Sequence, residues 1–182
     1  KTKDFTNISV EECIARDLKR VNSVGSAVIK KMYEQFLTPK IEPYFGGEHL
    51  ESIIICDLDG TLALLNGRSP YDASTCQKDL LNEPVAMILR KLDKPIVFTS
   101  GRDEKYRSQT ILWLSDNGFY DYKLYMRPDE DKRKDSIIKR EIFDTYIRGK
   151  YNVDLVLDDR DQVVQMWREI GLTCLQVNYG DF

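Results

Sequence analysis

An apolar run that ends in two closely spaced acids constrains the fold most: residues 53–61 are Ile-Ile-Ile-Cys-Asp-Leu-Asp-Gly-Thr. Consecutive isoleucines suit a strand that is covered on both faces, so this segment predicts a central strand of a parallel sheet. Asp57 and Asp59 then lie at the carboxyl end of the strand, where open α/β sheets bind their ligands. Two acids this close repel each other unless a cation or a shared proton relieves them. The alternative is an ordinary strand followed by an Asp-Gly turn, which leaves the downstream motifs unexplained.

Strand and helix patterns alternate through the rest of the chain. Asn82 is expected to cap a helix that has Pro84 in its first turn. Further strands are predicted at residues 95–99, 122–126, 154–158 and 173–177, and further helices at residues 104–117, 135–148 and 161–170. Such alternation predicts an α/β fold, a doubly wound parallel sheet with right-handed crossovers.

A short helical segment and a linker are predicted ahead of the sheet. A capping box at Ser9 starts a helix that runs to about Arg20. A second helix begins near Ser26, and its apolar stripe needs a partner to bury it. The stripe consists of Val24, Val28, Met32 and Phe36, and the linker contains Pro39, Pro43 and Gly46-Gly47. We therefore divide the chain into residues 1–45 and 46–182.

Composition and charge exclude several functional classes. A net charge of -3 over 182 residues argues against a broad electrostatic grip on nucleic acid, but it allows a site that holds only a strand terminus. No apolar run reaches the length of a membrane span and no signal peptide is visible, so we expect no membrane partner. The chain begins at Lys1 rather than methionine, so we expect a fragment or a processed product. Reduced, mostly buried thiols, which suit the cytoplasm, are predicted for Cys13, Cys56, Cys76 and Cys174.

Three further motifs follow the acidic strand in order: Thr99-Ser100-Gly101-Arg102, then Lys139, then Asp158-Asp159. With this series the chain resembles the haloacid dehalogenase (HAD) superfamily. More narrowly, residues 52–182 resemble the 3′-phosphatase domain of T-even phage polynucleotide kinase/phosphatases. The closest stretches are residues 67–72, 133–135 and 158–167. The resemblance implies a HAD-like doubly wound sheet without a large cap domain.

The resemblance also assigns chemistry to the acids. Asp57 is the expected nucleophile, since a carboxylate can form a covalent aspartyl-phosphate. Asp59 is expected to protonate the leaving oxygen and then to activate water, and its crowded position should favour the proton. Carboxylate and carbonyl ligands suit Mg²⁺. The implied ligands are the Asp57 carboxylate, the Asp59 carbonyl, Asp158 directly and Asp159 through water, although the sequence leaves the order of the last two open.

Three residues of the general motifs are expected to hold the phosphate. Ser100 can donate a hydrogen bond to a phosphate oxygen, and Gly101 lets the backbone approach. Lys139 is expected to neutralise the nucleophile and the phosphoryl group as a preorganised cation in a partly dry site.

The narrower resemblance adds two arginines and an acid. Arg68, on a flap after the first strand, and Arg102, after the phosphate-binding turn, can each fork onto a phosphate. Asp135 is expected to orient one of these arginines. Residues 132–134, Lys-Arg-Lys, are either a solvated patch or a contact to a nucleic-acid backbone.

Residues 12–20 and 24–33 resemble the C-terminal part of the phage kinase domain. In that family the arginines of this segment form a lid over the nucleotide phosphates, a role that falls here to Arg16 and Arg20. The alternative is a solvated amphipathic helix pair, which we favour because the chain has no Gly-x-x-x-x-Gly-Lys-[Ser/Thr] loop to hold a triphosphate. We therefore expect no kinase activity from this chain.

The spacing of the motifs bears on the substrate. The intervals where HAD phosphatases insert a cap domain are short here, so the site is expected to be open and to suit a macromolecular end. We interpret the chain as a Mg²⁺-dependent polynucleotide 3′-phosphatase for DNA or RNA ends in a phage-infected cell, either as a single chain or as a homo-oligomer. A capless phosphatase for a phosphoprotein or a small phosphate ester is the first alternative. A binding module that retains the fold is the second.

Overall fold

A computed structural model of the chain describes residues 8–37 and 41–180. The chain divides into two compact units, with the boundary between Ile41 and Glu42. Residues 42–45, which we predicted to be linker, therefore belong to the second unit. The predicted linker residue Pro39 lies outside the described residues.

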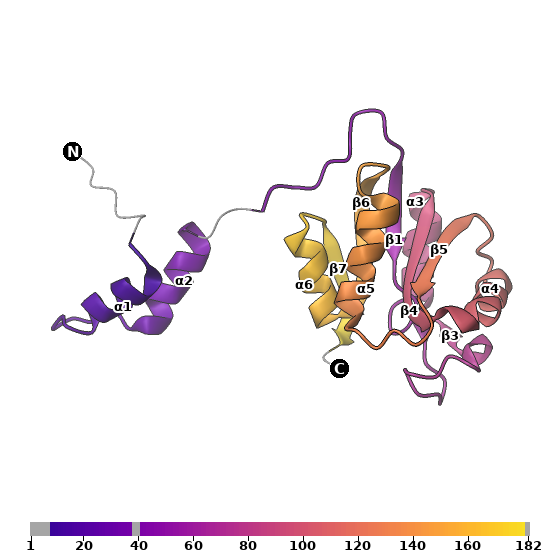
Figure 1. The fold of residues 1–182 in the computed structure, drawn as a ribbon, viewed down its shortest axis with the longest axis horizontal. Helices are drawn as coiled ribbons and strands as arrows, with labels where there is room; N and C mark the ends of the chain where they lie inside the picture. The colour runs from indigo at the N-terminus through magenta and orange to yellow at the C-terminus, as the bar shows by residue number, and fades with distance from the viewer. Residues whose placement is uncertain (1–7, 38–40, 181–182) are drawn as a thin grey trace. The chain divides into compact units, whose positions relative to one another are not determined.

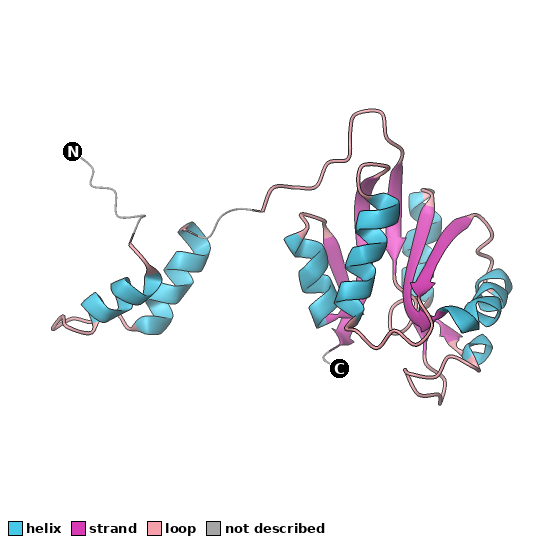
Figure 2. Cartoon of the chain, in the orientation of Figure 1, coloured by secondary structure: helices cyan, strands magenta, loops and turns pink. Residues whose placement is uncertain are grey.

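The second unit is built on one parallel five-stranded sheet (Figures 1 and 2). The strand order is β5-β4-β1-β6-β7, and every neighbouring pair is parallel. The strands are β1 (Ser52–Cys56), β4 (Ile96–Asp103), β5 (Tyr122–Arg127), β6 (Asn152–Arg160) and β7 (Cys174–Gly180). The helices are α3 (Glu83–Leu92), α4 (Arg107–Asp116), α5 (Asp135–Ile142) and α6 (Asp161–Glu169).

Helices cover both faces of this sheet. Ile54 and Cys56 of β1 belong to an apolar cluster with α3 and α4. Ile53 and Ile55 point to the opposite face and belong to a second cluster with α6 and with Phe143 and Ile147, which directly follow α5. The predicted α/β doubly wound sheet is confirmed, and the isoleucine run is buried because both of its faces pack against helices.

The ends of several elements differ from the sequence prediction. Strands β4 and β6 run further than predicted, so Ser100, Gly101 and Arg102 lie within β4 rather than after it, and Asp159 joins Asp158 within β6. Helix α4 is preceded by a 3-10 turn at Glu104–Tyr106, and α5 continues as a π-helical turn at Phe143–Ile147. Asn82 does stand before α3, but its side-chain amide donates to the Thr61 carbonyl at 2.8 Å instead of capping the helix.

A small flap separates β1 from α3. It contains an antiparallel pair of two-residue strands, β2 (Ala63–Leu64) and β3 (Leu80–Leu81), and a 3-10 turn, η1 (Cys76–Lys78). The sequence predicted a flap here but not its strands.

Residues 42–50 are fixed to the second unit by Tyr44. Its backbone amide donates to the Gly171 carbonyl at 2.9 Å, and its hydroxyl donates to the Tyr151 carbonyl at 3.0 Å. The ring meets Phe143 edge-on, with the centroids 5.2 Å apart. Gly171 has φ +93°, and a Cβ there would lie 2.2 Å from the Glu42 carbonyl oxygen, so only glycine fits.

The first unit contains α1 (Val10–Asp17) and α2 (Ser26–Phe36). The Ser9 hydroxyl accepts a hydrogen bond from the Glu12 amide at 3.2 Å, as the capping pattern predicts. Buried Asp17 accepts from Ser23 and from the Gly25 amide, which fixes the turn between the helices. The predicted apolar stripe of α2 is exposed along its length: Val24, Val28, Met32 and Phe36.

The state of the cysteines agrees with the sequence analysis. All four cysteines are free thiols, and Cys56, Cys76 and Cys174 are buried. Among the residues the structure describes, no helix is both long enough and apolar enough to span a membrane.

Candidate active site

Three carboxylates and one lysine meet at the carboxyl ends of β1 and β6. Lys139 of α5 is 1% exposed, and its Nζ lies 2.6 Å from Asp57 Oδ1, 2.9 Å from Asp158 Oδ2 and 3.4 Å from Asp135 Oδ2. Burial lowers the pKa of Lys139, but the three carboxylates outweigh burial and hold that pKa well above its ordinary value. Lys139 is therefore a permanent cation beside Asp57.

Charge repulsion at this point favours a bound cation. Ligand oxygens of Asp57, Asp158 and Asp159 lie within 4.8 Å of one another, and all three residues are buried. Burial raises the pKa of Asp57 well above its usual range, Lys139 opposes this rise, and the neighbouring acids add to it. Burial likewise raises the pKa of Asp159 to about 6. A set of carboxylate oxygens without His or Cys is the donor set that Mg²⁺ prefers, so the residues present fit this metal.

The carboxylates of the two acids of β6 differ in the hydrogen bonds that they accept from the protein. Asp158 Oδ2 accepts from Lys139 Nζ and from Trp167 Nε1 at 3.1 Å, and Asp158 does not line the cleft. Asp159 lines the cleft, and from the part of the chain that the structure describes its carboxylate accepts one hydrogen bond, from the Thr61 hydroxyl at 3.3 Å. Gly60 makes room for it, because a Cβ at this glycine would lie 2.2 Å from Asp159 Oδ2.

Asp59 is held by two arginines rather than crowded by other acids. Arg102 donates from Nε at 3.0 and 3.1 Å and from NH2 at 2.5 Å, and Arg68 donates from NH2 at 2.5 Å. Both guanidinium groups also contact Asp79, whose side chain is fully buried. Among the described residues, the charged groups that contact Asp59 are therefore two cations, not the crowding acids that the sequence analysis expected.

Asp79 was missed by the sequence analysis. It accepts from Arg68 Nε at 2.9 and 3.0 Å, from Arg68 NH2 at 2.6 Å and from Arg102 NH2 at 3.1 Å. Trp113 Nε1 donates to the Asp79 carbonyl at 2.8 Å, so a buried tryptophan fixes this part of the flap. A single acid in an irregular segment carries no pattern. Its one signal is its place directly before Leu80-Leu81, where an unpaired acid is unexpected.

Asp135 does not orient Arg68 or Arg102, so that prediction is wrong. Its carboxylate accepts from Arg127 NH2 at 3.1 Å and lies 3.4 Å from Lys139 Nζ. Asp135 begins α5, behind the Ser-Gly-Arg segment, so the arginine it meets is the last residue of β5.

The motif in β4 is packed tightly against α5. Ser100 is buried, and its hydroxyl oxygen accepts from the Arg102 amide at 3.2 Å. A Cβ at Gly101 would lie 2.7 Å from Asp135 Oδ1, so the glycine permits close approach of Asp135. Gly101 lines the cleft as well, which is compatible with its predicted contact to phosphate.

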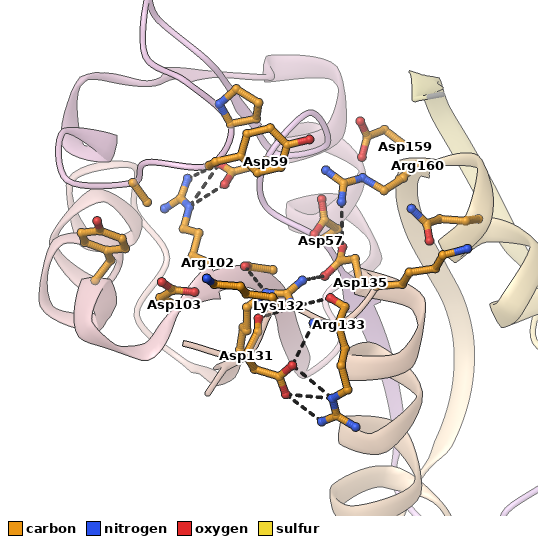
Figure 3. Close-up of a pocket in the computed structure, with 18 of the residues that line it drawn as sticks. Asp57, Asp59, Arg102, Asp103, Asp131, Lys132, Arg133, Asp135, Asp159 and Arg160 are labelled. Carbon is orange, nitrogen blue, oxygen red and sulfur yellow. Dashed lines mark hydrogen bonds and ion pairs between the residues drawn. The ribbon is translucent and has the colours of Figure 1, made fainter. Parts of the chain in front are cut away.

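A cleft of about 560 Å³ lies over these residues (Figure 3). Asp57, Asp59 and Asp159 line it together with Arg102. The flap and the loop before α5 contribute further walls, among them Pro70, Tyr71, Asp131, Lys132, Arg133 and Lys134. A carboxylate nucleophile, an acid, a lysine and arginines around one cleft suit the transfer of a phosphoryl group.

Comparison with known proteins identifies the family. Residues 51–182 match the family described as polynucleotide kinase PNKP phosphatase domain (HAD_PNKP). The chain belongs to this family. It therefore carries a HAD phosphatase domain, and the resemblance found in the sequence is confirmed.

Relatives of this HAD_PNKP chain are larger proteins. A putative bifunctional polynucleotide kinase/RNA ligase of Autographa californica nuclear polyhedrosis virus is 37% identical over 178 residues, which cover 91% of the chain and 25% of the relative. A solved structure of the Pnkp1/Rnl/Hen1 RNA repair complex matches with a TM-score of 0.74 and 43% identity, and the match covers 97% of the chain and 64% of the solved chain. A second Pnkp1/Rnl/Hen1 structure matches with a TM-score of 0.70 and 44% identity, and the match covers 97% of the chain and 62% of the solved chain. The chain thus spans less than two thirds of these relatives.

The two arginines assigned to a kinase lid lie in the first unit, outside the HAD_PNKP match. Arg16 pairs with Glu12 at 2.5 Å on an exposed helix surface. Arg16 and Arg20 both line an apolar groove of about 480 Å³ between α1 and α2. Their lid role stays a prediction.

Proposed function

We propose that this chain is a Mg²⁺-dependent polynucleotide 3′-phosphatase, and that residues 1–41 are the end of a kinase domain. The observation that carries the first proposal is the buried pair of Asp57 and Lys139 beneath a polar cleft. Relatives named for RNA ligation and RNA repair lead us to place RNA 3′ ends ahead of DNA ends. A site that takes only the strand terminus also accommodates the net charge of -3.

In this mechanism an Asp57 carboxylate oxygen attacks the phosphorus of the terminal phosphate. The bond from phosphorus to the 3′ oxygen breaks, and Asp59 gives its proton to that oxygen, which leaves as a 3′-hydroxyl. Asp59 then takes a proton from water, and the water oxygen attacks phosphorus to release inorganic phosphate and restore Asp57. Lys139 keeps its charge throughout and stabilises the nucleophile and the transferring phosphoryl group.

The metal would be held by Asp57, by the Asp59 carbonyl and by Asp159. We favour Asp159 over Asp158 as the direct ligand, the reverse of the order expected from the sequence, because Asp158 already accepts hydrogen bonds from Lys139 and Trp167. When bound, Mg²⁺ supplies positive charge that offsets the phosphate and the acids around it.

Both arginines donate guanidinium hydrogens to Asp59 in this structure. Arg102 uses Nε and NH2 on Asp59, and its NH1 donates to the Thr110 hydroxyl at 3.2 Å. We infer that the terminal phosphate takes over guanidinium hydrogens from Asp59 while Asp79 keeps both arginines in place. The exchange releases the Asp59 carboxyl toward the leaving oxygen.

Phosphate release from three substrates tests the proposal. A 3′-phosphorylated oligonucleotide should be hydrolysed with a higher kcat/KM than a phosphopeptide or p-nitrophenyl phosphate, and only with Mg²⁺ present. An equal or higher kcat/KM on the phosphopeptide would instead favour a capless phosphatase that acts on proteins. Full activity with EDTA would contradict the role of the metal.

A further inference from the structure

Three arginines that line the cleft are already engaged by the protein. Arg102 contacts Asp59 and Asp79. Arg127 donates to the carbonyls of Gly101, Asp131 and Arg133 and to Asp135, so it holds the loop before α5 in place. Arg133 is paired with Asp131 at 2.7 Å and with Glu141 at 2.6 Å.

Two lysines of the same loop differ from these arginines. Lys132 and Lys134 flank Arg133, both are exposed, and both line the cleft. Within residues 8–37 and 41–180, neither ammonium group has a hydrogen-bond or ion-pair partner. Because Arg127 and Arg133 fix the loop, its backbone loses little further conformational entropy when the lysines bind a ligand.

An exposed aromatic ring lines the cleft from the flap. Tyr71 is 82% exposed, although its neighbour Ala73 is buried in the flap. The ring packs on no other aromatic ring or cation of the described residues, whereas Tyr106, also at the cleft, donates its hydroxyl to Asp72. An exposed ring at a polar site is the element that proteins use to stack an unpaired base.

We propose that Tyr71 stacks on a base next to the 3′ end while Lys132 and Lys134 bind the backbone phosphate of that nucleotide. The inference rests on the proposed 3′-phosphatase function and adds how the strand beyond the terminal phosphate is gripped. A cleft of about 560 Å³ is larger than one phosphate needs and is of the size that holds a nucleotide. Stacking and point charges read no sequence, which suits an enzyme that accepts any strand end.

Steady-state kinetics on two substrates test this grip. The substrates are a 3′-phosphorylated single-stranded oligonucleotide and p-nitrophenyl phosphate, which has neither base nor backbone. Tyr71→Ala should raise KM for the oligonucleotide roughly fivefold to a hundredfold, Tyr71→Phe should restore it, and both should keep wild-type rates on p-nitrophenyl phosphate. The double variant Lys132→Ala, Lys134→Ala should raise the same KM. The slope of log KM against log salt concentration should fall by about 0.7 for each backbone phosphate that the lysines no longer neutralise.

Matched controls come from the amino ends of the strands, away from the cleft. Tyr120, 78% exposed before β5, and Lys91, exposed near the end of α3, carry the same side chains at that end of the sheet. Tyr120→Ala and Lys91→Ala should change neither KM nor the salt slope. Wild-type KM and salt slope in the Tyr71 and lysine variants, on an oligonucleotide that the wild type hydrolyses, would overturn the inference alone. A wild-type enzyme without preference for the oligonucleotide would overturn it together with the proposed function.

Discussion

Removing the Arg68 side chain tests the arginine and acid network directly. In Arg68→Ala, Asp59 loses one of its two guanidinium partners, and buried Asp79 loses the forked interaction with Arg68 Nε and NH2. Asp79 keeps Arg102 NH2 at 3.1 Å and a weak hydrogen bond from the Asn66 amide at 3.4 Å. The structure predicts a loss of stability as well as of rate.

The size of both effects follows from the burial of these groups. The Arg68 side chain is 4% exposed and that of Asp79 is 0% exposed. Breaking a buried ion pair and leaving its partner uncompensated costs about 3–5 kcal/mol. Because Arg102 still compensates Asp79, we expect about 2–3 kcal/mol, or a fall in Tm of roughly 5–10 °C for a domain of this size. A charge-assisted hydrogen bond to phosphate is worth about 1.5–3 kcal/mol, so kcat/KM should fall roughly tenfold to over a hundredfold without it.

Thermal unfolding and kinetics on a 3′-phosphorylated oligonucleotide and a nucleoside 3′-monophosphate measure the two effects. Arg68→Lys should recover little of either, because an ammonium cannot fork onto a carboxylate. Lys91→Ala, which removes one exposed cation on α3, serves as the matched control. A wild-type Tm and wild-type rates in Arg68→Ala would refute the network, and a lowered Tm with unchanged rates would limit Arg68 to a structural role.

The remaining predictions concern the acids, the metal and the domain boundary. Asp57→Asn and Asp59→Asn should each abolish turnover while retaining the wild-type circular dichroism spectrum; near-normal turnover in the first would exclude a covalent intermediate. Burial raises the pKa of Asp159 to about 6, so between pH 7 and pH 5 the folded protein binds a proton that the unfolded chain does not. The metal-free protein, kept in EDTA, should therefore become more stable as the pH falls from 7 to 5. Mg²⁺ should therefore raise Tm more at pH 7 than at pH 5, and an equal increase would argue against these acids as ligands. A chain that begins at Glu42 should fold. Tyr44→Ala should cost it about 2 kcal/mol, because the hydroxyl that donates to the Tyr151 carbonyl and accepts from the Gly149 amide is removed, whereas an unchanged Tm would place the boundary later.

Local patterns predicted the elements and the residues that lie on them. The isoleucine run identified β1 because burial on both faces demands an unbroken apolar sequence, and Asp57 follows directly from it. The two tryptophans, Trp113 of α4 and Trp167 of α6, are both buried. Their indole hydrogens in addition fix Asp79 and Asp158, a role that no sequence pattern signals.

Contacts between distant segments could not be predicted in the same way. Asp135 was assigned to the wrong arginine because its partner depends on how α5 packs beside β5, not on any spacing in the chain. Asn82 was placed correctly before α3, but the Thr61 carbonyl nearby competes for its amide. Asp79 lies in an irregular flap, where only the three-dimensional path brings it beneath Arg68.

One measurement tests the central claim most directly. Two oligonucleotides of identical sequence, one phosphorylated at the 3′ end and one at the 5′ end, are incubated with the protein and Mg²⁺, and phosphate release is followed for wild type and Asp57→Asn. We predict that wild type hydrolyses the 3′-phosphate with a kcat/KM about a hundredfold or more above that for the 5′-phosphate, and that Asp57→Asn hydrolyses neither. Equal rates on the two ends, or turnover by Asp57→Asn, would contradict the account.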